Sequence, residues 1–207
     1  MSADSDLLLD RIEAGDEPAI DELFARYRPR LRNLVALRLD PRLSARVDAS
    51  DVVQDAFATA ADRVGAYARE RSLPFYPWLR QLAIDRIVEL HRLHIQAQRR
   101  SVRREYSPDA QLSTSGQDDL VQRLAALCES PSRPAQRREA IALVQAAIEQ
   151  LSAVDREVLA LRYLEQLSAG DAASVLGISK NAFAQRHLRA LRRIRSLLSV
   201  TGGDDGI

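Results

Sequence analysis

Five arginines lie close together near the C-terminal end of the chain, at positions 186, 189, 192, 193 and 195, with no acidic residue between them. Cations set against phosphates supply much of the affinity of proteins for nucleic acid. Just before this run, Gly177 offers a left-handed turn after one helix, and Ser179 offers a side-chain oxygen that can cap the next. Two helices joined by such a turn make a helix-turn-helix, which places its second helix in the DNA major groove.

The second helix of this motif is predicted to run from Ser179 to Leu198. The amide of Gln185 can bind adenine through two hydrogen bonds, and Arg189 can bind guanine or a phosphate. Ile178, Phe183 and Leu191 are expected to pack inward. The residues expected to face DNA are Ser179, Lys180, Asn181, Gln185, Arg186, Arg189 and Arg193.

A second group of cations, preceded by aromatic residues, lies in the first half of the chain. Six arginines and a single acidic residue fall between positions 86 and 104. Aromatic rings stack on unpaired bases with ~1–3 kcal/mol per base, so rings beside a track of arginines suit single-stranded DNA. The alternative is a core cluster of rings beside a solvated face of charges. The candidates are Phe75, Tyr76, Trp78, Arg80, Arg86, Arg92, Arg99 and Arg100.

Carboxylates follow a helical spacing between positions 51 and 62. At 100° per residue, Asp51, Asp55 and Asp62 share one face. The opposite side is apolar and carries Val52, Val53, Ala56, Phe57 and Ala60. Asp51, Gln54 and Asp55 are therefore candidates for docking a basic partner, and an ordinary solvated helix face is the alternative.

The sequence gives no support to metal, cofactor or catalytic chemistry. His91 and His94 lie one helical turn apart, but a metal site needs at least one further ligand, and His187 falls in the other half of the chain. There is no Gly-rich phosphate loop, no nucleophile elbow and only one cysteine, Cys128. We expect no metal, no cofactor and no small-molecule substrate. No apolar stretch approaches the ~18 residues that span a bilayer, so we expect no membrane insertion.

The composition predicts an all-α fold. The formal net charge is +1, so the basic character is local rather than global. Ala, Leu and Arg abound, which favours helices, and no alternating apolar pattern persists. We expect two small helical domains joined by a flexible linker, the C-terminal one a helix-turn-helix.

Breaks in the apolar pattern place the elements. Helices are expected over 7–39, with a start at Asp16-Glu17-Pro18, from a cap at Ser50 to about Val64 with Gly65 just past the end, and from Trp78 to about Arg104. Serine and proline over 106–134 predict a linker with a short helix at 118–128. Further helices are expected over 135–150, 153–164, 169–176 and 179–198. The predicted domains are 1–105 and 135–200.

These residues resemble the sigma-70 family of RNA polymerase sigma factors, in its small two-domain form called the extracytoplasmic-function type. Asp48-Ala-Ser-Asp-Val-Val-Gln-Asp55 is similar to the polymerase-binding helix of the family, which implies that Asp51, Gln54 and Asp55 contact a coiled coil on the largest polymerase subunit. Residues 74–104 resemble the segment that melts and reads the minus-10 element. Residues 151–198 resemble the domain that binds the minus-35 element. The three motifs occur in the order of the family.

The resemblance implies a sigma factor that binds core RNA polymerase and directs promoter-specific transcription initiation. It implies a cytoplasmic protein that is not an enzyme, with core RNA polymerase and promoter DNA as partners. An anti-sigma protein is left open as a further partner. The alternative is a conventional helix-turn-helix regulator with a helical N-terminal dimerisation or sensing domain. The acidic face argues against it, because a repressor has no need of one. The missing catalytic constellation disfavours a nucleic-acid enzyme.

Overall fold

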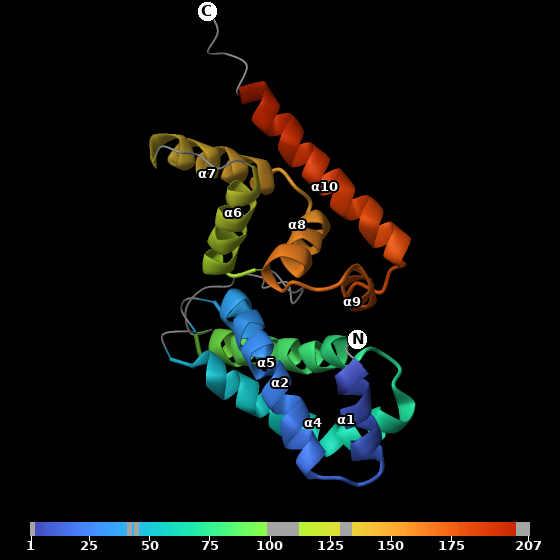
Figure 1. Ribbon diagram of the computed structural model, residues 1–207. Coiled ribbons are helices and arrows are strands. Elements are labelled where there is room, and N and C mark those ends of the chain that lie inside the picture. The colour runs from blue at the N-terminus through green and yellow to red at the C-terminus, as the bar shows by residue number, and fades with distance from the viewer. Residues whose placement is uncertain (1–2, 41–42, 44–45, 99–111, 129–133, 202–207) are drawn as a thin grey trace, which may run out of the picture. The chain divides into compact units, whose positions relative to one another are not determined.

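The computed structural model describes residues 3–40, 43, 46–98, 112–128 and 134–201, which form helices and no strand (Figure 1). The chain divides into unit 1, Met1–Ala110, and unit 2, Gln111–Ile207. The all-α class is confirmed. Within the described part, no helix is long and apolar enough to cross a membrane. The elements are α1 (Ala3–Glu13), α2 (Pro18–Arg38), α4 (Ala49–Glu70), α5 (Phe75–Gln98), α6 (Thr114–Cys128), α7 (Pro134–Glu149), α8 (Ala153–Leu159), the π-helix η1 (Ala160–Leu164), α9 (Ala169–Val175) and α10 (Lys180–Thr201).

In unit 1, α2, α4 and α5 pack against one another, and α1 packs on α2 and α4. The apolar face predicted for α4 is buried, from Val52 to Ala60. Phe57 on this face stacks on Phe24 of α2 with ring centroids 4.6 Å apart. Burial of this face leaves the acidic side of α4 at the surface.

The ends of α4 differ from the prediction. Its N-cap is Asp48, whose side chain accepts a hydrogen bond from the Ser50 N–H at 2.6 Å, whereas Ser50 lies inside the helix. The helix does not end at Gly65 but continues to Glu70, because Tyr67 and Ala68 beyond it are buried. That burial outweighs the ~1 kcal/mol that glycine costs a helix interior.

The helix expected over 7–39 is two helices. α1 begins before residue 7 and is followed by a turn at Gly15, where φ is +89°. α1 buries Leu8, Leu9 and Ile12. Ion pairs tie it further to unit 1, since Arg71 contacts Asp10 and Glu13, and Arg26 contacts Asp4.

Unit 2 begins earlier than predicted, because the described part of the expected 106–134 linker is largely helix α6. This helix packs on α7 and η1 and buries Leu120, Val121 and Leu124. The hydroxyl of Ser113 accepts the N–H of Gly116 at 3.0 Å and so caps the start of α6. Residues 114–128 therefore belong to the core of unit 2 rather than to a flexible tether.

The remaining helices of unit 2 form the predicted helix-turn-helix, with α10 as its long second helix (Figure 1). Serine hydroxyls cap α8, α9 and α10, since Ser152, Ser168 and Ser179 each accept a backbone N–H three residues on, at 3.0–3.1 Å. Gly177 has φ +62°, the left-handed conformation expected of it. Both local signals that predicted the turn are confirmed.

Candidate functional site

The inner face of α10 fixes which of its residues reach the surface. Phe183, Ala190 and Ile194 are buried at spacings of seven and four residues, so they mark one stripe. Ile178 and Leu191, which were also expected inside, are half-buried. The opposite side of the helix is left to solvent.

His187 joins this inner stripe to η1. One of its ring nitrogens, Nε2, lies 3.1 Å from the hydroxyl of Tyr163, and its ring is parallel to that of Phe183 at 6.2 Å. Burial, and then the charge of Arg162, lower the pKa of His187 below its ordinary value. A neutral imidazole at pH 7 therefore helps to hold the basic helix on unit 2.

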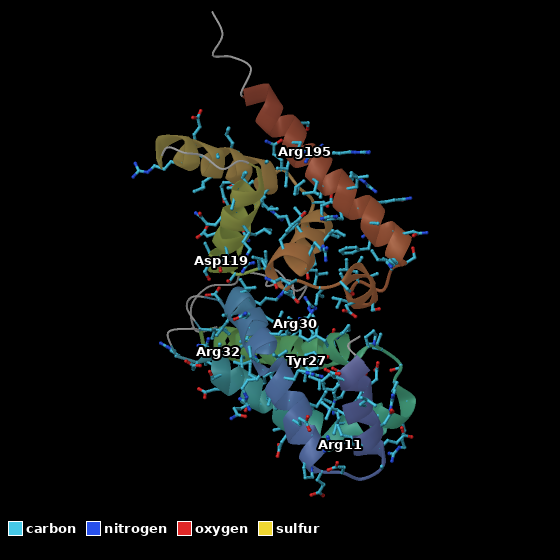
Figure 2. The ribbon with its side chains drawn as sticks, in the orientation of Figure 1. Arg11, Tyr27, Arg30, Arg32, Asp119 and Arg195 are labelled. Atoms are coloured by element: carbon cyan, nitrogen blue, oxygen red, sulfur yellow. The ribbon has the colours of Figure 1, made fainter. Side chains whose placement is uncertain are left out.

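The outer face of α10 carries most of the residues predicted to face DNA. Lys180, Asn181, Gln185, Arg189 and Arg193 are exposed, as is Ser179, while Arg186 is half-buried. Arg195 also lies on this helix (Figure 2). The exposed side is therefore basic and carries amides that can bind base edges.

Arg192 is also exposed, although it was not among the residues expected to face DNA. It lies seven residues after Gln185 and eleven after Asn181, so the three side chains fall on one stripe at 100° per residue. The same helical spacing, counted forward from Gln185, would have identified it.

The acidic face of α4 lies at the surface as expected. Asp51, Gln54 and Asp55 are exposed, and so is Asp62 on the same stripe. At the start of the helix, hydrogen bonds from Ser50 lower the pKa of Asp48. The face therefore presents carboxylates and an amide to a partner, with the buried side of α4 fixing their direction.

One of these carboxylates is held by a residue of α5. Nε and Nη2 of Arg86 both contact Oδ2 of Asp55 at 2.8 Å. Nη1 of the same guanidinium binds Oε2 of Glu89 at 2.8 Å. The hydrogen bonds to Glu89 and then to Asp55 raise the pKa of Arg86. The guanidinium of Arg86, which was predicted to track DNA phosphates, is thus engaged by two carboxylates, and its contact with DNA stays a prediction.

The aromatic residues at the start of α5 belong largely to the core. Phe75 is 1% exposed and Tyr76 is 3% exposed. Tyr27 of α2 packs on both rings, with centroids at 5.1 and 5.9 Å. The guanidinium carbon of Arg30 lies 3.7 Å from the centre of the Tyr76 ring, and both Tyr27 and Arg30 project from α2 (Figure 2). Phe75 and Tyr76 are therefore core residues in this structure, and their stacking on bases stays a prediction.

The other residues predicted to contact single-stranded DNA differ in how exposed they are. Arg80 is 3% exposed and belongs to the interior. Trp78 is half-buried and stacks on Tyr67 at 4.4 Å, while Arg92 is exposed. Arg99 and Arg100 lie outside the described residues. Among the predicted residues that the structure describes in this segment, Trp78, Arg86 and Arg92 are at least partly exposed, and Arg86 is engaged by Asp55 and Glu89.

Among the residues that the structure describes, potential metal ligands do not come together. Nowhere in the described ranges do three His, Cys, Asp or Glu side chains gather as a metal ion would require. His91 is buried, and its Nε2 lies 3.4 Å from the backbone N–H of Asp40. This histidine joins α5 to the end of α2.

Comparisons with known proteins match both units. The family model for Sigma-70 region 2 matches residues 23–100, and that for Sigma-70 region 4 matches residues 141–194. The chain is 30% identical to the RNA polymerase sigma-H factor of Pseudomonas aeruginosa over 92% of each chain. It is 28% identical to the RNA polymerase sigma factor CnrH of Cupriavidus metallidurans over 94% of each.

A solved structure shares the fold. It is CnrH in complex with the cytosolic domain of CnrY, and its likeness covers 95% of this chain and 97% of that one, with a TM-score of 0.53 and 23% identity. The two family matches fall one in each unit, and each includes one of the surfaces described above, the acidic face of α4 and the outer face of α10.

Proposed function

Because the chain belongs to the sigma-70 family, in its extracytoplasmic-function type, we propose that its two units divide the work of promoter-specific transcription initiation. The chain is an RNA polymerase sigma factor, which binds core polymerase and directs it to promoters. Sigma factors are not enzymes. Unit 1 is proposed to bind core polymerase and the minus-10 element, and unit 2 the minus-35 element.

For unit 1, we propose that Asp51, Gln54 and Asp55 form the polymerase contact. All three are exposed on one stripe of α4, whose other side is buried. Carboxylates in this position suit a basic partner surface and steer its approach over about a Debye length. This acidic stripe is the observation on which the polymerase assignment rests.

A titration of core polymerase tests this assignment. Asp51→Ala with Gln54→Ala should weaken binding and leave the helical content unchanged. The matched control is Asp119→Ala with Gln122→Ala, an exposed pair of the same residue types at the same spacing on α6 of unit 2. Equal affinities for the wild type and the α4 variant would refute the docking role of this face.

For unit 2, we propose that the exposed side of α10 reads the minus-35 element. Gln185 supplies an amide for a base edge, and Arg193, further along the helix, supplies a charge for phosphates. A bidentate base contact discriminates by ~1–3 kcal/mol. Transcription from a promoter library should show relaxed preference at particular minus-35 positions for Gln185→Ala. Arg193→Ala should weaken all promoters about equally, and identical preferences in wild type and Gln185→Ala would rule out base reading by Gln185.

Fewer residues are accessible to the minus-10 element in this structure than the sequence predicted. Trp78 and Arg92 can meet DNA in the described state, whereas Phe75, Tyr76 and Arg80 are buried. We propose that contact of the buried rings with bases requires a rearrangement of the start of α5. Fluorescence of a base analogue placed in the minus-10 element, followed during promoter opening, tests whether Tyr76→Ala affects opening beyond its effect on the fold.

The remaining proposals concern location and a further partner. CnrH is found with the cytosolic domain of CnrY. We propose that this chain likewise binds an anti-sigma protein and works in the cytoplasm, where polymerase and promoters are found. The conventional-regulator alternative is not favoured by the matches to region 2 and region 4. Stimulation of core polymerase on candidate promoters by the purified chain distinguishes the two.

A further inference from the structure

Arg86 lies between the acidic face of α4 and the helix α5, and it binds both. Two of its nitrogens converge on one oxygen of Asp55, Oδ2, and the third binds Glu89 one turn further along α5. The side chain of Arg86 is 31% exposed and that of Asp55 is 49% exposed, so the pair lies at the rim of the surface rather than in the core. Asp55 and Arg86 come from different helices, 31 residues apart.

We propose that Arg86 is a positioning residue for polymerase binding, which fixes the carboxylate of Asp55 for the partner. This inference rests on the proposed docking role of α4. A guanidinium that grips one carboxylate oxygen from two nitrogens restricts the rotamer of that side chain. Both contacts are to Oδ2, so Oδ1 is the oxygen that Asp55 offers to a basic group on polymerase.

Glu89 completes the arrangement by orienting Arg86. Its Oε2 binds Nη1, the nitrogen of Arg86 that does not contact Asp55. The two carboxylates thus hold opposite sides of one planar group, which a lysine ammonium cannot reproduce. Glu89 thus orients Arg86, and Arg86 orients Asp55. Of these three residues, Asp55 is the one proposed to contact polymerase.

Whether removal of Arg86 weakens or strengthens polymerase binding distinguishes a positioning role from a purely electrostatic one. Arg86 reduces the negative charge of the docking face, so its removal would strengthen attraction to a basic partner if long-range electrostatics dominated. Positioning predicts the opposite, because a freed carboxylate must be immobilised when the complex forms. That immobilisation corresponds to roughly a two- to tenfold loss of affinity.

A double-mutant cycle on binding of the full chain to core polymerase tests the proposal. Arg86→Ala should weaken binding roughly two- to tenfold. It should have no further effect in a chain that already carries Asp55→Ala, because Arg86 acts through that carboxylate. Arg86→Lys, which keeps the charge and loses the two-point grip, should also weaken binding. Arg123→Ala on α6 is the control for loss of an exposed arginine.

Three results would overturn the proposal while leaving the docking role of α4 intact. The first is unchanged or tighter binding of Arg86→Ala when Asp55→Ala binds more weakly. The second is an equal loss with and without Asp55, which would mean that Arg86 meets polymerase itself or supports the fold. The third is Arg86→Lys binding like the wild type. If Asp55→Ala and the Asp51/Gln54 variant both bind normally, the proposed function of α4 fails instead, and this inference fails with it.

Discussion

The hydroxyl of Ser179 has two proposed roles, and substitutions at this position separate them. It accepts the N–H of Ala182 at 3.1 Å and so caps α10. It is also exposed at the end of the helix proposed to enter the minus-35 element. Ser179→Ala removes both roles, whereas Ser179→Asp keeps an oxygen for the cap and adds a negative charge.

The cost of Ser179→Ala follows from the geometry. The substitution leaves the Ala182 N–H without its side-chain partner, and loss of a serine cap costs ~1 kcal/mol. Unit 2 spans residues 111–207, a size for which ~1 kcal/mol lowers the melting temperature by roughly 4–8 °C. Ser179→Asp should melt within a few degrees of the wild type, because aspartate caps as well as serine and its charge favours a helix N-terminus.

Two measurements complete the test. Thermal unfolding followed by circular dichroism measures the loss of stability when the cap is removed. Transcription from a minus-35-dependent promoter with core polymerase measures the effect on the DNA contact. We expect Ser179→Asp to be stable but poorly active, because its carboxylate is repelled by phosphates. A Ser179→Ala chain that melts like the wild type would refute the capping estimate, and a fully active Ser179→Asp chain would place the start of α10 away from DNA.

Three further predictions follow from other features of the chain. Gly65→Ala should stabilise unit 1 by ~0.5–1 kcal/mol, because the position is helical and an added Cβ meets no atom within 4 Å; a lower melting temperature would contradict this. Acidification below pH 6.5 should destabilise unit 2, because the lowered pKa of His187 gives stability that is present above the unfolded pKa and lost as the pH falls through the folded one. The melting temperature of His187→Phe should not show this loss of stability below pH 6.5. A pH profile of the melting temperature identical to that of the wild type would exclude the role of His187. The free chain, with a net charge of +1, should bind duplex promoter DNA poorly at physiological salt; tight promoter-specific binding in an anisotropy titration would favour a conventional regulator.

The features that were predictable from sequence are those encoded within one element or one turn. Gly177 and Ser179 specify a left-handed turn and a cap through their own backbone and side-chain chemistry. The exposed face of α4 follows from the position of its apolar residues, because one helix face is buried. Local signals of this kind do not depend on the remainder of the fold.

The features that sequence alone missed depend on partners far along the chain. The burial of Tyr76 comes from Tyr27 and Arg30 on α2, and the engagement of Arg86 comes from Asp55 on α4. A run of arginines has the same spacing whether its members face solvent, DNA or a carboxylate. The helix through Gly65 is a related case, since the burial of Tyr67 beyond it overrides a local preference.

Helix α1 has a consequence for how this protein can be dissected. The Sigma-70 region 2 match begins at residue 23, yet α1 lies before it and buries Leu8, Leu9 and Ile12. A fragment cut at the start of the similarity would uncover the apolar surface that these side chains cover, and would leave Arg71 without Asp10 and Glu13. Uncovered apolar surface promotes self-association, so such a fragment would aggregate. The folded unit is therefore larger than the region 2 match, and its boundary is set by buried surface.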